Sequence, residues 1–104
     1  MNKINRETRY DKMYKAILSL KNEEECKNFF EDLCTMTELQ AMEQRFQVAW
    51  LLDQGLIYNE ILEQTGASSA TISRVKRSLH YGSNGYEVVF SRLKEAEASD
   101  GRKS

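Results

Sequence analysis

Apolar residues recur along this chain at every third or fourth position, with polar residues between them. This spacing is typical of amphipathic helices, and no segment keeps the two-residue alternation of a half-buried strand. The pattern therefore predicts an all-α protein of six helices. The expected ranges are residues 5–20, 22–34, 36–54, 58–65, 69–80 and 84–98.

Helix starts are marked by a capping residue followed three positions later by glutamate, a spacing that can satisfy two backbone N–H groups reciprocally. The helix over 36–54 has the widest apolar stripe, which includes Trp50 as a core or interface residue, and Gly55 is expected to end it. The three capping pairs are Asn22 with Glu25, Thr35 with Glu38, and Asn84 with Glu87.

Residues 58–79 contain two short helical patterns separated by Thr65-Gly66-Ala67-Ser68. Gly66 tolerates the left-handed backbone that a sharp turn requires, and Ser68 can cap the next helix. Together these features predict a helix-turn-helix. The second helix turns Ile72, Val75 and Leu79 inward.

The outward faces of this second helix carry small, hydroxylated and basic residues, as expected of a helix that enters a DNA major groove. Two roles are predicted for them. Base edges would be approached by Ser68, Ser69, Ala70 and Ser73. Phosphates would be contacted by Thr71, Arg74, Lys76 and Arg77, which fix the register.

Charge is distributed unevenly along the 104 residues, although the net charge is only −1. Residues 64–86 contain no acidic side chain, whereas residues 22–43 contain seven acidic residues and one lysine. The basic N-terminal region adds further cations. A localised basic surface is therefore compatible with a nearly neutral chain.

The predicted apolar stripes are too wide for a chain of this length to cover alone, so we expect a homodimer. Residues 1–104 would form a single domain. Its parts would be a helical dimerisation core over 1–55, the helix-turn-helix over 56–82, a C-terminal packing helix over 83–98 and a polar tail over 99–104.

Other chemistry has little support in the sequence. Cys26 and Cys34 are interpreted as buried thiols, with a redox or intermolecular role as the alternative, and their helical spacing does not indicate a metal site. His80, the only histidine, is interpreted as a surface or phosphate-contacting residue because no nucleophile and acid accompany it. No enzyme is predicted. The absence of a signal peptide or membrane span favours a cytoplasmic protein.

Two segments of the chain, residues 33–55 and residues 66–79, each contain a distinctive set of residues. They are Leu33-Cys34-Thr35, Glu38, Ala41, Arg45, Leu52 and Gly55, followed by Gly66-Ala67, Ala70-Thr71-Ile72-Ser73-Arg74 and Ser78-Leu79. Over residues 33–93 the chain resembles the tryptophan repressor family, and in particular its Trp-repressor-like YerC/YecD branch. The resemblance implies an intertwined, all-helical homodimer whose helix-turn-helix units address successive major grooves of a near-palindromic, double-stranded DNA operator.

The resemblance also implies a small-molecule effector site. In the tryptophan repressor two arginines sandwich the corepressor, and the matching positions are Arg45 and Arg74, with Ser78 and Thr35 beside them. This chain departs from the family at Val75, where the repressor has glycine, and its helix-turn-helix segment is one residue shorter. The β-branched side chain would occupy space that bound tryptophan needs, so no cofactor is assigned and the effector is left open.

The sequence thus predicts a sequence-specific DNA-binding transcription regulator, in particular a dimeric repressor that acts by operator occlusion and is open to control by a ligand. The alternative is a protein-interaction module that uses the helix-turn-helix fold without specific DNA binding. In that case the acidic residues over 22–43 would form the docking surface.

Overall fold

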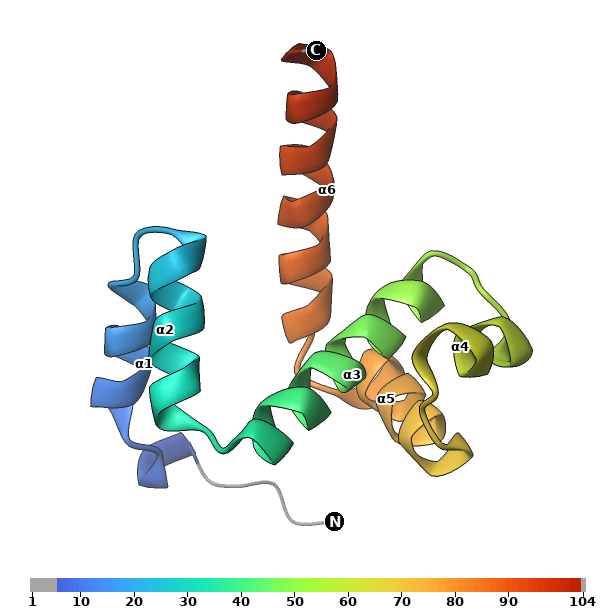
Figure 1. Ribbon diagram of the computed structural model, residues 1–104, viewed down its shortest axis with the longest axis horizontal. Helices are drawn as coiled ribbons and strands as arrows, with labels where there is room; N and C mark the ends of the chain where they lie inside the picture. Colours follow the sequence, from blue (N-terminus) through green and yellow to red (C-terminus); the bar gives the residue numbers. More distant parts are fainter. Residues whose placement is uncertain (1–5, 104) are drawn as a thin grey trace. The chain divides into compact units, whose positions relative to one another are not determined.

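The computed structural model describes residues 6–103, and side chains for residues 6–100. The described residues form six α-helices and one 3-10 helix, with no strand among them, which confirms the predicted all-α fold (Figure 1). The elements are η1 (Arg6–Thr8), α1 (Asp11–Leu18), α2 (Glu23–Leu33), α3 (Met36–Asp53), α4 (Tyr58–Thr65), α5 (Ser69–Tyr81) and α6 (Gly85–Lys103).

The first helix differs from its predicted range of 5–20, whose first residue lies outside the described part of the chain. Tyr10 takes an extended backbone conformation, with φ −92° and ψ 95°, and separates η1 from α1. Asp11 then lies in the first turn of α1, where a carboxylate interacts favourably with the helix dipole. Apolar periodicity does not indicate this local break, because Tyr10 lies at the spacing of the apolar positions of the predicted helix whether or not it is itself helical.

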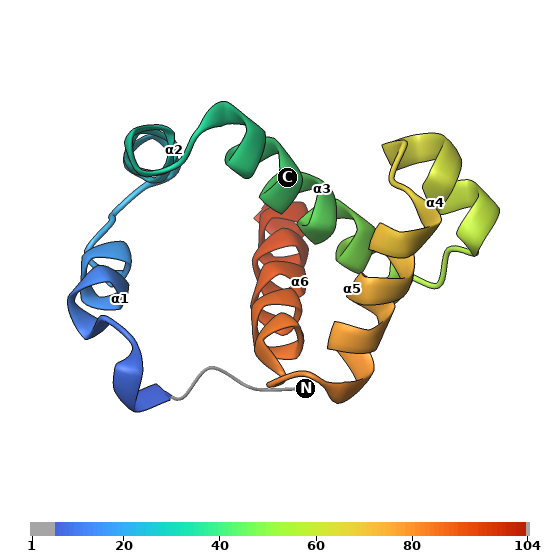
Figure 2. The same ribbon diagram turned by 90° about the horizontal axis from the view of Figure 1, so that it is seen from below.

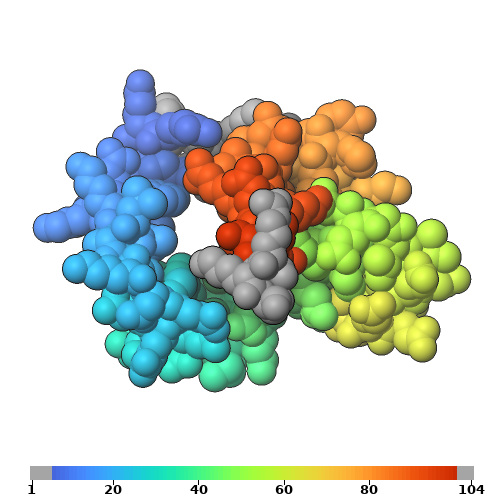
Figure 3. Space-filling view, turned by 90° about the horizontal axis from the view of Figure 1, so that it is seen from above, coloured from blue at the N-terminus to red at the C-terminus, as the bar shows by residue number. Residues whose placement is uncertain are grey.

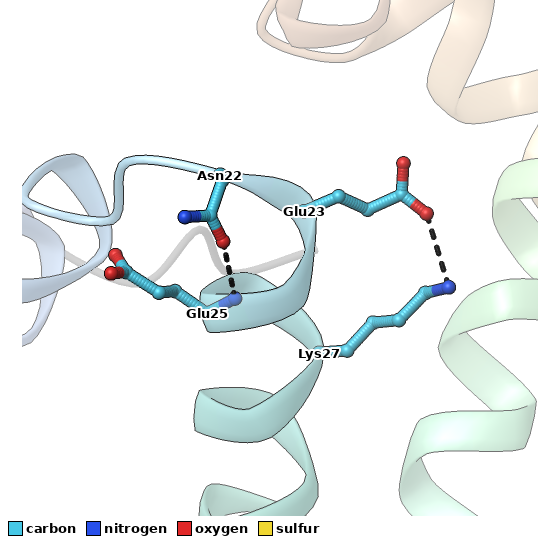
Figure 4. Close-up of polar contacts among 4 residues, drawn as sticks. All are labelled: Asn22, Glu23, Glu25 and Lys27. Atoms are coloured by element: carbon cyan, nitrogen blue, oxygen red, sulfur yellow. Dashed lines mark hydrogen bonds and ion pairs between the residues drawn. The ribbon is translucent and has the colours of Figure 1, made fainter.

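Side-chain capping fixes the start of α2, as predicted (Figure 4). The Asn22 Oδ1 atom accepts a 2.8 Å hydrogen bond from the backbone N–H of Glu25. Glu25 in turn accepts from the N–H of Lys21 at 2.9 Å, one residue earlier than the reciprocal pattern requires. An ion pair of 3.0 Å joins Glu23 to Lys27 on the next turn.

The chain divides into two compact units, residues 1–39 and residues 40–104. In the described part of the first unit, η1, α1 and α2 bury no residue. Phe29 and Phe30 pack edge to face with ring centroids 5.7 Å apart. Tyr10, Leu18 and Leu33 nevertheless remain 73%, 83% and 49% exposed. This unit therefore carries apolar surface that its own helices do not cover.

The second unit contains the hydrophobic core, to which α3, α4, α5 and α6 all contribute. Figures 1 and 2 both show α4 and α5 beside the C-terminal half of α3, and Figure 3 shows the atoms of α3 and α4 as a continuous surface. Trp50 is half-buried and packs against this core. The buried residues are Val48, Ala49, Leu51, Ile61, Ala67, Ile72, Val75 and Phe90.

Aromatic stacking and one ion pair join α6 to α3 within the second unit. The Phe90 ring lies edge to face with Trp50 at 5.2 Å and with Phe46 at 5.6 Å between centroids. Further along α6, the Lys94 ammonium lies 2.6 Å from the Asp53 carboxylate. The first half of α6 is therefore anchored to α3 by both kinds of contact.

The junction of α5 and α6 follows the prediction only in part. Helix α5 ends at Tyr81, one residue past its predicted range of 69–80, and the N–H of Gly82 donates to the Ser78 carbonyl at 3.0 Å. Asn84, however, has a φ of 63°, which is not the extended conformation of a capping residue. The helix continues to Lys103, past the predicted end near Ala98. Residues 91–100 are all exposed, so no apolar periodicity could locate this end.

Thr35 and Glu38 form the predicted capping box, and this geometry makes a pH-dependent contribution to stability. The Thr35 N–H donates to Glu38 Oε1 at 2.8 Å, and the Glu38 N–H donates to Thr35 Oγ1 at 3.1 Å. The backbone N–H of Thr35, and then its side chain, lower the pKa of Glu38 below its usual value of 4.5. The stabilisation is therefore complete above that value and is lost as the pH falls through the lowered pKa.

We expect an NMR titration of the Glu38 carboxyl carbon to give a pKa below 4.5. Replacing Glu38 with glutamine should remove this part of the acid dependence of unfolding, which urea denaturation between pH 3 and pH 6 would measure. An acid dependence identical to that of the unsubstituted protein would contradict the assignment.

Candidate nucleic-acid interface

Helices α4 and α5 form the predicted helix-turn-helix (Figure 2). A glycine in the left-handed conformation makes the turn between them. Gly66 has φ 68° and ψ 9°, and its N–H donates to the Leu62 carbonyl at 2.9 Å. The next residue, Ala67, is fully buried in the core. The chain thus leaves α4 and enters α5 within three residues.

Thr65 stabilises this turn with its side chain, a role that was not predicted from the sequence. Its hydroxyl donates to the Ile61 carbonyl at 2.8 Å and accepts from the Ala67 N–H at 3.1 Å. Its own carbonyl accepts from the Gln44 side-chain amide on α3 at 3.2 Å. A threonine directly before a glycine at a helix end is the only local signal of this role.

Ser68 caps α5, as predicted. Its backbone is extended, and its hydroxyl oxygen accepts from the Thr71 N–H at 3.1 Å. The same hydroxyl donates to Thr71 Oγ1, also at 3.1 Å. The two side chains that begin α5 therefore hold each other in place.

The side chains of α5 and its cap range from buried in the core to exposed on the outer surface. Ile72 and Val75 are 4% and 2% exposed, whereas Thr71 and Leu79 are half-buried. Every other predicted DNA-contacting residue is exposed. These exposed residues are Ser68, Ser69, Ala70, Ser73, Arg74, Lys76 and Arg77. Their contact with DNA stays a prediction.

The four candidate effector residues lie on different parts of the structure. Arg45 is half-buried on α3, Arg74 is exposed on α5, and Thr35 caps α3 within the first unit. Ser78 lines an open hollow of about 540 Å³ between the end of α5, the start of α6 and Phe46. The other three candidates do not line this hollow. Val75, the departure from the repressor pattern, has its side chain in the core.

The remaining candidate groups lie on or near the surface. Cys26 and Cys34 are free thiols and half-buried, not buried as predicted, because the helices of the first unit bury no residue in its described part. His80 is exposed beside Tyr81, with ring centroids 6.3 Å apart. Among the described residues, no three His, Cys, Asp or Glu side chains are grouped to hold a metal ion. The helices described are all too short or too polar to cross a membrane.

The packing of α4 and α5 against α3 and α6, with one face of α5 left free, defines a helix-turn-helix protein. Comparison with known families is more specific, because the model described as Trp repressor protein matches residues 8–94. The chain belongs to the Trp repressor family, whose members are regulators and not enzymes.

Similar proteins come from several bacteria. The Bacillus subtilis (strain 168) protein YerC, described as uncharacterized, is 50% identical over 93 residues, which cover 89% of each chain. A Staphylococcus aureus structure described as a candidate Trp repressor has 50% identity and a TM-score of 0.78, and covers 81% of this chain and 84% of its own. A TrpR-like protein from Eubacterium eligens has 52% identity and the same TM-score, with 81% and 87% covered.

The left-handed turn gives a direct test of how the helix-turn-helix is built. At Gly66 an added Cβ meets no atom within 4 Å, so the cost of alanine is conformational and not steric. We expect Gly66→Ala to lower the free energy of unfolding by about 1 kcal/mol, as measured by urea denaturation.

Gly85 provides the matched control, because it begins α6 and also has open space around it. Without a positive φ, Gly85→Ala should be neutral or slightly stabilising. Equal destabilisation by the two substitutions would show that backbone conformation at Gly66 does not limit stability.

Proposed function

We propose that this protein is a sequence-specific DNA-binding transcription regulator, and that it acts as a dimeric repressor by occluding its operator. The observation that carries the proposal is the outer face of α5, on which small and hydroxylated side chains lie next to three exposed cations. Such a face can enter a major groove, contact base edges and neutralise phosphates.

Electrostatics around α5 support this role. The segment from residue 64 to residue 86 has no acidic side chain. The two ion pairs found among the described side chains both lie on other helices, so Arg74, Lys76 and Arg77 have no carboxylate partner there. Cations in this state are available to displace counterions from a phosphate backbone.

Uncovered apolar side chains support a dimer. In the first unit these include Leu18 and Leu33, and on α6 they include Val88 and Val89, which are 47% and 44% exposed. A second copy could bury such side chains, each of which contributes about 1.5–3 kcal/mol when fully buried. Two helix-turn-helix units would then contact half-sites roughly 34–36 Å apart.

We also propose that a small molecule controls this regulator. Arg45 and Arg74 could pair with a carboxylate, and Ser78 and Thr35 could supply hydroxyl contacts, as the family pattern implies. Val75 stands where the tryptophan repressor has glycine, and a β-branched side chain there would occupy space that bound tryptophan needs. We therefore propose that tryptophan itself is not the effector.

An interaction module remains the second candidate, supported by the acidic first turn of α2. Glu23, Glu24 and Glu25 lie together there and are exposed. A basic protein partner would suit this surface, and DNA would not. The discriminating measurement is retention on nonspecific duplex DNA at low salt.

Arg77→Ala tests the phosphate contacts. Because this contact is to the backbone, we expect weaker binding to every duplex. The slope of log K against log salt should fall by about one for each helix-turn-helix unit. Fluorescence anisotropy across a salt series would measure both effects.

Two further variants serve as controls. Arg92→Ala removes an exposed arginine from α6 and should leave the salt slope unchanged. Ser73→Ala should alter base preference at the same salt slope. If the unsubstituted dimer is not retained on DNA at low salt, the interaction module becomes the better interpretation.

Selection from a random duplex pool, with and without tryptophan, tests the operator and the effector together. We expect enrichment of near-palindromic sites whose half-sites lie one helical turn apart, because the dimer has twofold symmetry. Enrichment should be the same in both arms. Tighter binding with tryptophan would overturn the argument from Val75, and asymmetric single sites would overturn the dimer.

A further inference from the structure

The described hydrogen bonds include one from a side chain of α3 to the turn of the helix-turn-helix. Gln44 Nε2 donates to the Thr65 carbonyl at 3.2 Å, across 21 residues of sequence and in a partly buried setting. Carbonyls in the last turn of a helix have no partner within the helix. Gln44 therefore satisfies an acceptor that α4 leaves open.

This bond differs in kind from the other contacts between α3 and the helix-turn-helix. Val48, Ala49 and Leu51 of α3 share a core cluster with residues of α4 and α5, and such apolar packing is not directional. A hydrogen bond weakens steeply with angle and distance. It can therefore select one orientation among several that the core would accept.

The turn that receives this bond is itself rigidly bonded. Thr65 connects Ile61 to Ala67 through its hydroxyl, and α5 begins two residues after Ala67. A constraint at the Thr65 carbonyl is thus transmitted to the first turn of α5. That turn carries Ser69 and Ala70, two of the candidate base-contacting residues, whereas Arg77 lies two turns further along.

We propose that Gln44 is a positioning residue, which sets how α5 presents its first turn to the bases and so determines sequence discrimination without contacting DNA. This inference rests on the proposed DNA-binding function.

The test compares Gln44→Met, which keeps the side-chain length but removes the donor, with Gln47→Met on the exposed surface of α3. Losing the bond lowers the fraction of molecules in the competent orientation. Affinity for the selected operator should fall about five- to tenfold, the factor expected for one net hydrogen bond. Nonspecific affinity should change less than twofold, with an unchanged salt slope. The Gln47→Met variant should behave like the unsubstituted protein.

Gln44→Glu provides a second variant, because at neutral pH its carboxylate cannot donate to the Thr65 carbonyl. It should show the same selective loss. Equal loss of operator affinity and nonspecific affinity would overturn the proposal. So would a lowered thermal stability with an unchanged ratio of operator affinity to nonspecific affinity.

Amide hydrogen exchange gives a readout that does not need DNA. Exchange at Gly66 and Ala67 should accelerate in Gln44→Met and not in Gln47→Met. Unchanged exchange would overturn the positioning role. If the unsubstituted protein binds no duplex, the proposed function fails, and accelerated exchange would then show that Gln44 orders the turn but does not serve DNA recognition.

Discussion

Burial of one side of α5 is the constraint on which the rest of the second unit depends. Ile72 and Val75 enter the core that also contains Val48 and Ile61, and each contributes about 1.5–3 kcal/mol by leaving water. The exposed ion pair between Lys94 and Asp53 contributes at most about 1 kcal/mol, by comparison. Apolar packing therefore decides which side of α5 faces outward, and polar contacts adjust the orientation of the helix.

Features that depend on neighbouring residues could be predicted from the sequence. Ser68 and Gly66 behave as expected because a cap and a left-handed turn are determined within about four residues. Apolar spacing also predicts α4, whose Ile61 is buried in the core. The family resemblance then predicts how the helices within residues 33–93 are combined.

Features that depend on distant residues could not be predicted. The Gln44 bond joins positions 21 residues apart, and the Lys94 ion pair joins positions 41 apart, so no local spacing indicates either one. Asn84 looks like a cap in sequence, but the junction between α5 and α6 gives it a φ of 63°. The contacts of the candidate site with DNA or an effector involve a second molecule. The sequence and the fold of this chain alone therefore do not determine them.

The lack of acidic residues around α5 can also be compared with the first turns of the other helices. Each of the other five α-helices within residues 6–103 has an acidic residue in its first turn, where it interacts favourably with the helix dipole by about 0.3–1 kcal/mol. In α5 the first turn has none, and uncharged Ser68 supplies the cap. A carboxylate there would stabilise the helix but repel phosphates. The lack of a carboxylate in the first turn of α5 therefore agrees with the proposal that this end of the helix approaches DNA.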